Sequence, residues 1–420
     1  MDPFVYKKGV LYCEDVSLAK IAKKVGTPFY CYSSAHLKNR FNAYKTGFGP
    51  RKHLICFAVK ANSNLAVLSC LGNLGAGADI VSGGELYRAL KAGIPANRIV
   101  YSGVGKTKEE MAYALKNSIA MFNIESMEEL QQLSKVAKKL GQRAPIAFRV
   151  NPDVDPKTHP YISTGLKKNK FGLSREQALE AYALALKDPH LSIKGIDCHI
   201  GSQIVELDPF IDAFKRLKEL VVQIEKMGIS LSFIDIGGGL GISYKDENPP
   251  APQTYISAIT DEAKDLPQTI IVEPGRSICG NAGVLVTKIL YVKENDAKRF
   301  YIVDAGMNDL GRPSLYDAYH EIKPVQQTVA PSYKETDVVG PICETGDFLA
   351  RSRPMPDLAS GSLLAVLSAG AYGFTMSSNY NSRPRVPEVM VYGNRFHVVR
   401  RRQTWQDLVA GESIPKGESC

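Results

Sequence analysis

The 420-residue sequence lacks the patterns that mark membrane proteins, disulfide-rich proteins and zinc cages. No apolar run is long enough to span a bilayer, and the N-terminal residues 1–8 contain no apolar core of a signal peptide. The eight cysteines occur singly, without a Cys-x-x-Cys pair, so neither a zinc cage nor a redox dithiol is indicated. Because single cysteines fit a reducing compartment, we expect a cytoplasmic protein without a membrane partner.

Internal repeats, low-complexity tracts and long linkers are also missing. With 44% hydrophobic and 23% charged residues, the composition is that of an ordinary globular protein, and the length predicts two domains. The excess of 52 Lys and Arg over 43 Asp and Glu is mild and diffuse. Its densest cluster, Arg400-Arg-Arg402, fits the solvated end of a strand better than a nucleic-acid site, so we expect no nucleic-acid partner.

From residue 35 onward, short apolar runs alternate regularly with stretches of helical periodicity. The expected strands are 54–59, 78–81, 98–101, 119–123, 145–150, 195–200, 233–236 and 269–273. The expected helices between them are 64–72, 84–92, 107–117, 126–140, 174–187, 209–227 and 253–264. Eight such units predict a (β/α)8 TIM barrel over residues 35–278. A doubly wound sheet is the alternative, although it rarely needs eight strands in one run.

The pattern changes after residue 276. Helical periodicity nearly disappears, and runs rich in Val, Ile and Tyr recur at 284–292, 299–303, 335–340, 363–367, 387–392 and 396–400. These short β-forming runs predict an antiparallel β-domain, a sandwich or a barrel, over residues 279–420. Residues 1–34 are expected to join it, with a hairpin or strand at 4–13, a helix at 17–25 and a strand at 28–32. We expect the two domains to pack tightly.

Lys60 stands at the end of the first barrel strand, directly after six apolar residues. One reading is a solvated lysine that closes a buried strand. The other is a functional amine, because barrel chemistry collects at the carboxyl ends of strands and a desolvated lysine is a nucleophile toward aldehydes. Four more polar or glycine-rich clusters follow later strands: residues 79–85, 198–203, 235–241 and 273–277. Together the five clusters favour an active site.

Three of these clusters have both a structural and a functional reading. Gly237-Gly-Gly239-Leu-Gly241 fits either a tight turn or a loop whose backbone binds a phosphate, and its spacing does not match the dinucleotide fingerprint. Glu273 precedes Pro-Gly and pairs either with Arg276 or with a protonated heterocyclic nitrogen. His199 either packs on an apolar face or stacks on a flat cofactor. No Asp, Glu and His set at metal spacing accompanies it, so we expect no metal.

A nucleophilic lysine, a phosphate loop and an acidic partner for a pyridine ring fit pyridoxal 5'-phosphate, an aldehyde that forms a Schiff base with lysine. The motifs Phe57-Ala-Val-Lys-Ala-Asn62, His199-Ile-Gly-Ser202, the glycine run and Glu273-Pro-Gly-Arg276 resemble those of fold-type III pyridoxal phosphate decarboxylases. This resemblance covers essentially the whole chain. It implies the two-domain architecture shared with alanine racemase.

Three motifs of the second half narrow the resemblance to the diaminopimelate decarboxylase family. They are the stretch 304–316, Gly340-Pro-Ile-Cys343-Glu344-Thr-Gly-Asp347, and Gly370-Ala-Tyr372-Gly373. Ornithine decarboxylases typically carry Asp rather than Glu after the cysteine. A substrate with an amino acid group at its far end accounts for the difference, because Arg276 and Arg312 supply planar donors for a remote carboxylate. Left without that carboxylate, both arginines would be unpaired in a closed site.

The resemblance implies a role for each matching residue. Catalytic roles fall to Lys60, which carries the cofactor, to His199, which stacks on its ring, and to Cys343, which returns a proton to the α-carbon. The implied cofactor-binding residues are Lys60, Asp79, His199, Ser202, Gly238, Gly239, Glu273, Gly275, Arg276 and Tyr372. The implied substrate-binding residues are Arg276, Arg312, Tyr316, Glu344 and Tyr372. The implied reaction converts the D-configured centre of meso-2,6-diaminopimelate and yields L-lysine and CO2.

The resemblance further implies a homodimer in which Cys343 and Glu344 complete the site of the neighbouring subunit. Cys343 read alone could be a small buried hydrophobe. Residues 151–172 are expected to form a long loop over the site. Rival readings are a decarboxylase of carboxynorspermidine or a similar substrate, a racemase, and a non-catalytic pyridoxal phosphate carrier. A racemase typically uses a tyrosine in place of the Cys-Glu pair, and the carriers are lone barrels without a β-domain.

Overall fold

The computed structural model of the chain describes residues 2–154, 170–296, 298–327 and 333–415. It divides into two compact units. Residues 36–281 form one unit, called the barrel unit below. Residues 1–35 and 282–420 form the other, called the β-unit. The loop expected at 151–172 falls largely outside the described residues.

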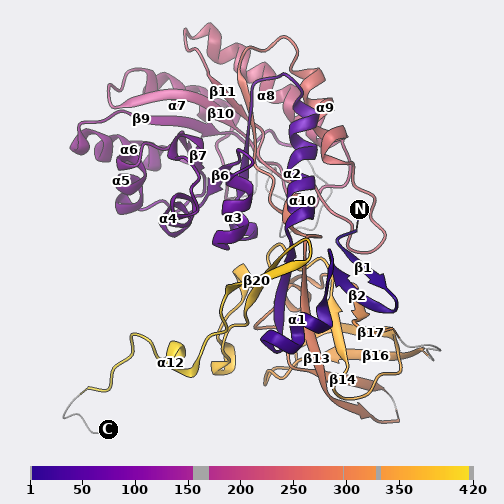
Figure 1. Cartoon of the computed structure of the whole chain (residues 1–420). Helices are drawn as coiled ribbons and strands as arrows, with labels where there is room; N and C mark the ends of the chain where they lie inside the picture. Colours follow the sequence, from indigo (N-terminus) through magenta and orange to yellow (C-terminus); the bar gives the residue numbers. More distant parts are fainter. Residues whose placement is uncertain (1, 155–169, 297, 328–332, 416–420) are drawn as a thin grey trace. The chain divides into compact units, whose positions relative to one another are not determined.

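The barrel unit contains a closed barrel of parallel strands, as expected (Figure 1). Its strands in the described residues are β5 (His53–Ala58), β6 (Gly77–Ile80), β7 (Ile99–Tyr101), β8 (Met121–Ile124), β9 (Ala144–Arg149), β10 (Leu191–Asp197), β11 (Phe233–Asp235) and β12 (Thr269–Val272). Closure is direct, because β12 pairs in parallel with β5 through Ile271 opposite Leu54. A barrel closed in this way sets all the strand carboxyl ends in one ring.

The apolar runs form strands because their side chains are buried on both faces. One core cluster joins residues of five strands, namely Leu54, Cys56, Val100, Met121, Ala147 and Ile271. Helices follow the strands: α3 (Leu65–Gly72), α4 (Gly83–Lys91), α5 (Lys108–Lys116), α6 (Met127–Leu140), α7 (Arg175–Leu186), α8 (Asp208–Lys226), α9 (Pro252–Glu262) and the short α10 (Arg276–Cys279). Thr107 and Ser174 begin their helices with full capping boxes.

The β-unit combines the two ends of the chain. Its N-terminal part contains the sheet of β1 (Phe4–Lys7), β2 (Val10–Cys13) and β3 (Val16–Ser17), then α1 (Leu18–Val25) and β4 (Phe29–Ser33). Its C-terminal part contains β13 (Gly283–Glu294), β14 (Arg299–Val303), α11 (Arg312–Tyr316), β15 (Ile322–Pro324), β16 (Tyr333–Val339), β17 (Phe348–Pro356), β18 (Leu363–Val366), β19 (Glu388–Tyr392), β20 (Arg395–Arg400) and α12 (Trp405–Leu408). Strand β4 pairs with both β13 and β19, so the N-terminal segment belongs to this sheet.

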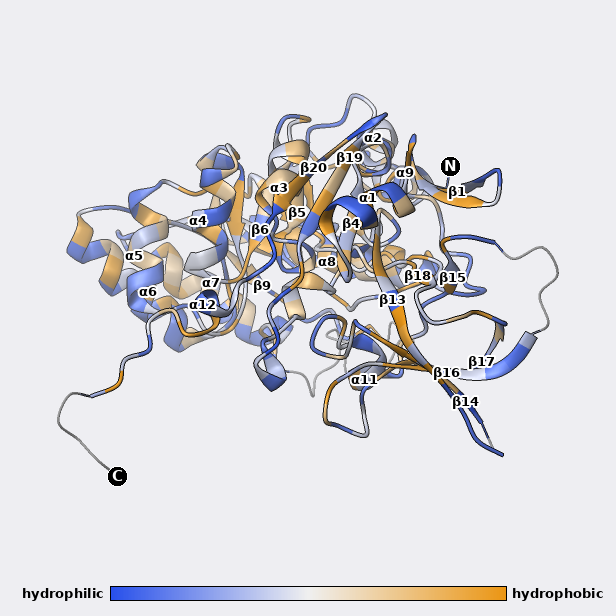
Figure 2. Cartoon of the chain, turned by 60° about the horizontal axis from the view of Figure 1, so that its bottom comes forward, coloured by the Kyte–Doolittle hydropathy of each residue, from blue (hydrophilic) through white to orange (hydrophobic). Residues whose placement is uncertain are grey.

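Apolar side chains concentrate along the strands of this unit, as Figure 2 shows for β13 and β19. One buried cluster brings together residues that are distant in the sequence, including Phe29 of β4, Val286 of β13 and Val389 of β19. The N-terminal strand therefore contributes directly to the core of the C-terminal sheet. Burial of such residues supplies most of the favourable free energy of folding.

The expected elements are largely confirmed, with some corrections. Helix α2 (Ser34–Phe48), the short helices α10, α11 and α12, and strands β15 and β17 were not expected. The sheet is mostly antiparallel but not purely so, since β14 pairs with β16 in parallel and β4 pairs with β19 in parallel. Parallel neighbours need a crossover of a dozen or more residues, which the long connection from β14 to β16 provides. Asp79 lies within β6 rather than after it.

Among the described residues, no helix is both long and apolar enough to cross a membrane.

We predict that Gly77→Ala destabilises the barrel unit. A Cβ at residue 77 would lie 2.2 Å from the carbonyl oxygen of Arg98 and 2.9 Å from Sγ of Cys56. Such overpacking costs about 1–3 kcal/mol, which should lower the midpoint of urea denaturation. In the matched control Gly105→Ala, the added Cβ has no atom within 4 Å, and its effect should stay within about 0.5 kcal/mol. Equal midpoints for the two variants would contradict the packing described for β6.

Candidate active site

Lys60 lies in a 3-10 turn, Val59–Ala61, directly after β5. Its Nζ lies 2.5 Å from Oδ2 of Asp79, and the lysine side chain is 37% exposed whereas that of Asp79 is fully buried. Among the described residues, the other oxygen of Asp79, Oδ1, has no hydrogen-bond partner. The amine is therefore held at the end of its strand by a buried carboxylate. This geometry fits a functional amine better than a solvated lysine.

Three buried carboxylates from neighbouring strand ends form a cluster beside this ion pair. Oxygen atoms of Asp197, Asp235 and Glu273, from the ends of β10, β11 and β12, all lie within 4.8 Å of one another. Burial raises the pKa of Asp235 to about 7. Burial and the charge of Asp235 raise the pKa values of Asp197 and Glu273 well above their usual range. At neutral pH the cluster consequently holds protons.

A cluster of this kind can accept a proton-bearing nitrogen or a cation. The sequence led us to expect no metal, because no Asp, Glu and His set at metal spacing accompanies His199, and this cluster was not foreseen. Part of the cluster already has partners, since Asp235 Oδ1 accepts the N–H of Gly237 at 3.0 Å and Asp197 Oδ2 lies 3.9 Å from Nε of Arg149. A buried guanidinium beside the cluster already supplies one positive charge.

Arg149 links this cluster to the loops around it. Its Nη1 donates to Oε1 of Glu125 at 2.9 Å, and Oε2 of Glu125 accepts the N–H of Gly172 at 2.8 Å. Burial lowers the pKa of Arg149, but the charges of Glu125 and Asp197 outweigh burial and raise it. Neither Arg149 nor Glu125 was expected as a site residue. The one sequence signal was an arginine that ends an otherwise apolar strand.

His199 is a partly buried ring two residues beyond the end of β10. The N–H of Gly238 donates to its Nδ1 at 3.1 Å, so in the neutral ring the hydrogen lies on Nε2. Burial and the positive charges of Arg149 and Lys60 hold the pKa of His199 well below its usual range. The imidazole is therefore neutral and fixed in orientation, which suits a ring that packs flat against another.

The glycines of the run after β11 lie at positions where an added Cβ would clash with neighbouring atoms. A Cβ on Gly238 would lie 2.3 Å from the carbonyl oxygen of Glu273, and Gly239 has a φ of +117°, which favours glycine. The run therefore lies closely against the loop that carries Glu273. A loop of this kind lets backbone N–H groups approach an anion.

Arg276, at the start of α10, is buried and faces two hydroxyl groups. Its Nη2 donates to Oγ of Ser202 at 3.0 Å, and its Nη1 donates to the Tyr244 hydroxyl at 2.5 Å. A guanidinium and a serine hydroxyl side by side can both donate to a phosphate. Tyr244 was not expected, because nothing in its sequence neighbourhood marks it. Gly275 precedes this helix, where a Cβ would lie 2.9 Å from that of Ala61.

The remaining expected residues belong to the β-unit. Arg312 begins α11 and is buried, and its Nη1 lies 3.1 Å from Nε2 of His320. Tyr316 ends the same helix and is partly exposed. Tyr372 follows β18 with a φ of +56°. His320 was missed because a single buried histidine has no sequence signature.

Cys343 and Glu344 form an exposed turn between β16 and β17. Its backbone is held by Asp347, whose Oδ2 accepts the N–H of Ile342 at 2.7 Å, and by Asn381, whose Oδ1 accepts the N–H of Cys343 at 2.8 Å. Cys343 is therefore not the small buried hydrophobe that its size alone suggests. Its thiol stands at the surface of this unit on a turn with a fixed backbone.

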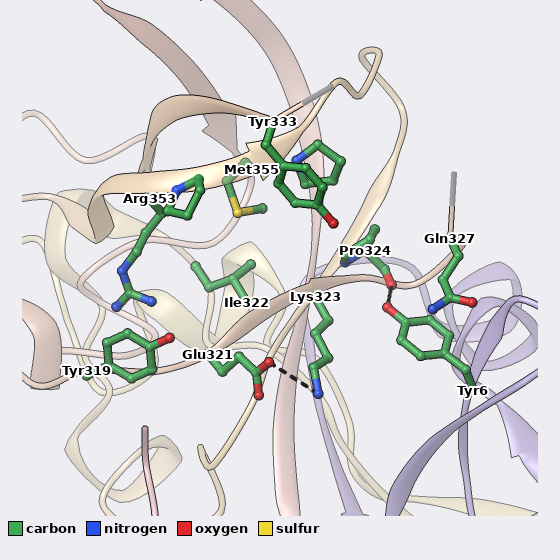
Figure 3. A pocket seen from close by; sticks show the side chains of 12 residues that line it. Tyr6, Tyr319, Glu321, Ile322, Lys323, Pro324, Gln327, Tyr333, Arg353 and Met355 are labelled. Atoms are coloured by element: carbon green, nitrogen blue, oxygen red, sulfur yellow. Dashed lines mark hydrogen bonds and ion pairs between the residues drawn. The ribbon is translucent and has the colours of Figure 1, made fainter. Parts of the chain in front are cut away.

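The β-unit also contains a cavity of about 520 Å³ that none of the expected residues line (Figure 3). Its polar groups contact one another: Lys323 pairs with Glu321 at 3.2 Å, and the Tyr6 hydroxyl donates to the carbonyl of Pro324 at 2.5 Å. The guanidinium of Arg353 lies 3.5 Å from the centroid of the Tyr319 ring, so these contacts lie within the lining of the cavity itself. The barrel unit, in contrast, brings Asp197, Asp235 and Glu273 together at neighbouring strand ends.

Comparison with known proteins reveals a family match. Residues 34–280 match the family described as "Pyridoxal-dependent decarboxylase, pyridoxal binding domain". A diaminopimelate decarboxylase of Pseudomonas aeruginosa is 53% identical over 99% of both chains. One of Haemophilus influenzae is 50% identical over 98% of this chain and 100% of its own.

Solved structures agree with these relatives. Diaminopimelate decarboxylase from Helicobacter pylori, complexed with L-lysine, superposes with a TM-score of 0.89 at 45% identity and covers 93% of this chain and 98% of its own. The enzyme from "m. jannaschi" has a TM-score of 0.94 at 38% identity and covers 99% of this chain and 98% of its own. The similarity thus extends over both units.

We predict that Gly238→Ala impairs binding of pyridoxal phosphate to the barrel unit. The added Cβ would force the glycine run away from the carbonyl of Glu273, which displaces the backbone around His199 as well. The affinity of the cofactor-stripped protein, measured by absorbance titration, should fall by about tenfold or more, the loss expected from one or two displaced polar contacts. Gly84→Ala adds a Cβ with ordinary room and serves as the control. Unchanged affinity in Gly238→Ala would contradict the assignment.

Proposed function

This chain belongs to the diaminopimelate decarboxylase family of pyridoxal-dependent decarboxylases, and we propose from that membership that it converts meso-2,6-diaminopimelate to L-lysine and CO2. This reaction is the last step of lysine biosynthesis. The observation that supports it most directly is a strand-end lysine, held by a buried aspartate, beside a protonated carboxylate cluster and a glycine loop.

The residues at the barrel end fit pyridoxal 5'-phosphate. When bound, it supplies an aldehyde that joins to amines and a ring that accepts the electron pair left behind by CO2. Lys60 holds the cofactor covalently, and Asp79 orients the amine. Ser202 and Arg276, which already lie 3.0 Å apart, bind the phosphate with the backbone of Gly238 and Gly239.

Glu273 and His199 act on the cofactor ring. Because burial and the neighbouring carboxylates raise the pKa of Glu273, this group would hold a proton for the ring nitrogen of the bound cofactor. His199 packs against the ring as a neutral imidazole, since the Gly238 N–H occupies its Nδ1. Gly275 leaves room for the loop that carries Lys60. Tyr372 is assigned to cofactor binding by its match to the family motif alone.

The β-unit supplies the substrate-binding groups and the acid. Arg312 binds the remote carboxylate, Tyr316 and Tyr372 add hydroxyl groups, and Glu344 binds the remote ammonium. The Cys343 thiol gives a proton to the carbon that has lost CO2. Arg276 can serve the same remote carboxylate, although its contact with Ser202 supports the phosphate role more directly.

We further propose a homodimer in which Cys343 and Glu344 complete the partner's site. Their exposure on a backbone-fixed turn supports this arrangement, because an acid that serves a neighbouring subunit has to stand at the surface of its own. A cytoplasmic location is proposed as well. The seven cysteines in the described part of the chain are all free thiols, as in a reducing compartment.

A decarboxylase of carboxynorspermidine is the second candidate. The purified enzyme should prefer meso-diaminopimelate by at least about a hundredfold in kcat/KM, since a site built for a remote carboxylate and ammonium leaves charged groups unpaired with other substrates. Parallel assays of CO2 release from both compounds measure this. Equal or reversed preference would assign the chain to the second candidate. No decarboxylation of either compound would instead point to a non-catalytic carrier.

Two inactive variants should complement each other if the site is shared between subunits. Lys60→Ala should be colourless after cofactor addition, whereas Cys343→Ala should be yellow and fixed by borohydride but lose about 10²–10⁴ in decarboxylation rate. Mixed and redimerised, the two should regain about a quarter of the parent activity, because half of the dimers are mixed and each holds one complete site. Absence of recovery, with mixed dimers confirmed by mass, would overturn the shared site.

A further inference from the structure

His320 is a buried histidine, two residues before the start of strand β15, that contacts Arg312. Its Nε2 lies 3.1 Å from Nη1 of Arg312, and its Nδ1 lies 2.8 Å from the carbonyl oxygen of Leu367. A carbonyl can only accept and a guanidinium can only donate. The ring is therefore the neutral tautomer with its hydrogen on Nδ1, and its Nε2 accepts from Arg312.

The ring is held on a rigid support. The N–H of Leu367 donates to the carbonyl of Glu321 at 2.8 Å, and strands β15 and β18 pair with Ile322 opposite Val366. His320 thus lies where this ladder begins, and its Nδ1–H adds a side-chain hydrogen bond across the same two segments. The segment that follows Leu367 leads to Tyr372, another proposed substrate-binding residue.

We propose that His320 is a positioning residue, which presents the Arg312 guanidinium in one orientation for the remote carboxylate of substrate and product; this inference rests on the proposed function. An arginine side chain has many rotamers, and each ligand that binds to a free one has to immobilise it. The hydrogen bond to a fixed acceptor removes part of that cost before the ligand arrives. His320 should therefore raise the affinity of ligands that carry the carboxylate and leave the affinity of ligands without it unchanged.

Two commercially available ligands, one with the carboxylate and one without it, test this difference in affinity. L-Lysine, the product, carries the carboxylate that Arg312 would bind, whereas 1,5-diaminopentane is the same chain without it. Their affinities for the holoenzyme are measured by isothermal titration calorimetry. The ratio of the two affinities reports the carboxylate contact and cancels general changes in stability or cofactor content.

His320→Gln and His320→Met are matched variants for this test. Both lose the bond to Leu367, and both have similar length, but only glutamine offers an oxygen that can accept from Arg312. Relative to His320→Gln, His320→Met should bind L-lysine about tenfold more weakly, as expected for one lost hydrogen bond to a charged group, and bind 1,5-diaminopentane equally well. KM should rise in the same proportion, with kcat changed much less.

If His320→Met does not fold, His320→Asn replaces it in this comparison. Asparagine keeps the hydrogen bond to Leu367 but not the one to Arg312.

Arg312→Met distinguishes failure of this inference from failure of the proposed function. If Arg312→Met weakens L-lysine selectively but His320→Met and His320→Gln bind both ligands alike, His320 is structural only and the inference is overturned. If Arg312→Met leaves the ratio of affinities unchanged, the proposed substrate role of Arg312 is wrong and the inference falls with it. A selective loss in both Arg312→Met and His320→Met supports both.

Discussion

The ion pair between Lys60 and Asp79 sets the constraint on which the barrel site depends. A fully buried carboxylate is costly unless it is paired, and an amine at a strand end is the partner that it has. The pair orients the amine across the opening of the barrel. The Asp79 carboxylate of this pair raises the pKa values of Glu273 and Asp235, and at Glu273 the charge of Lys60 acts in the opposite direction.

The cluster of carboxyl groups next to this pair has no stabilising role of its own. Buried acids whose pKa values are raised well above their usual range cost stability at neutral pH, because each would ionise more readily in the unfolded chain. Such a cost is typical of functional sites, where a proton must be held at a fixed place. Arg149 and its partner Glu125 limit the cost and tie the cluster to the loops around it.

The β-unit holds one of its proposed substrate-binding residues through an uncharged group. Arg312 is buried, and one of its contacts is the imidazole of His320. A hydrogen bond to a neutral acceptor holds the guanidinium without cancelling its charge. In the turn that carries Cys343, a hydrogen bond holds the backbone while the residue itself stays exposed.

Sequence periodicity determined the eight strands, most of the helices and the end of each strand at which polar clusters gather, because burial on both faces and helical spacing are local properties. It also marked Lys60, Glu273 and the glycine run, since each interrupts an apolar stretch. The helix α2 and the parallel pairs of the β-unit were not visible, because α2 has little amphipathic periodicity and pairing partners are chosen by packing. The contacts of Asp79, Arg149, Tyr244 and His320 were decided only by the tertiary structure. These contacts join residues that are not neighbours in the chain, and no spacing rule connects a lone side chain to a partner that the closed barrel or the sheet brings beside it.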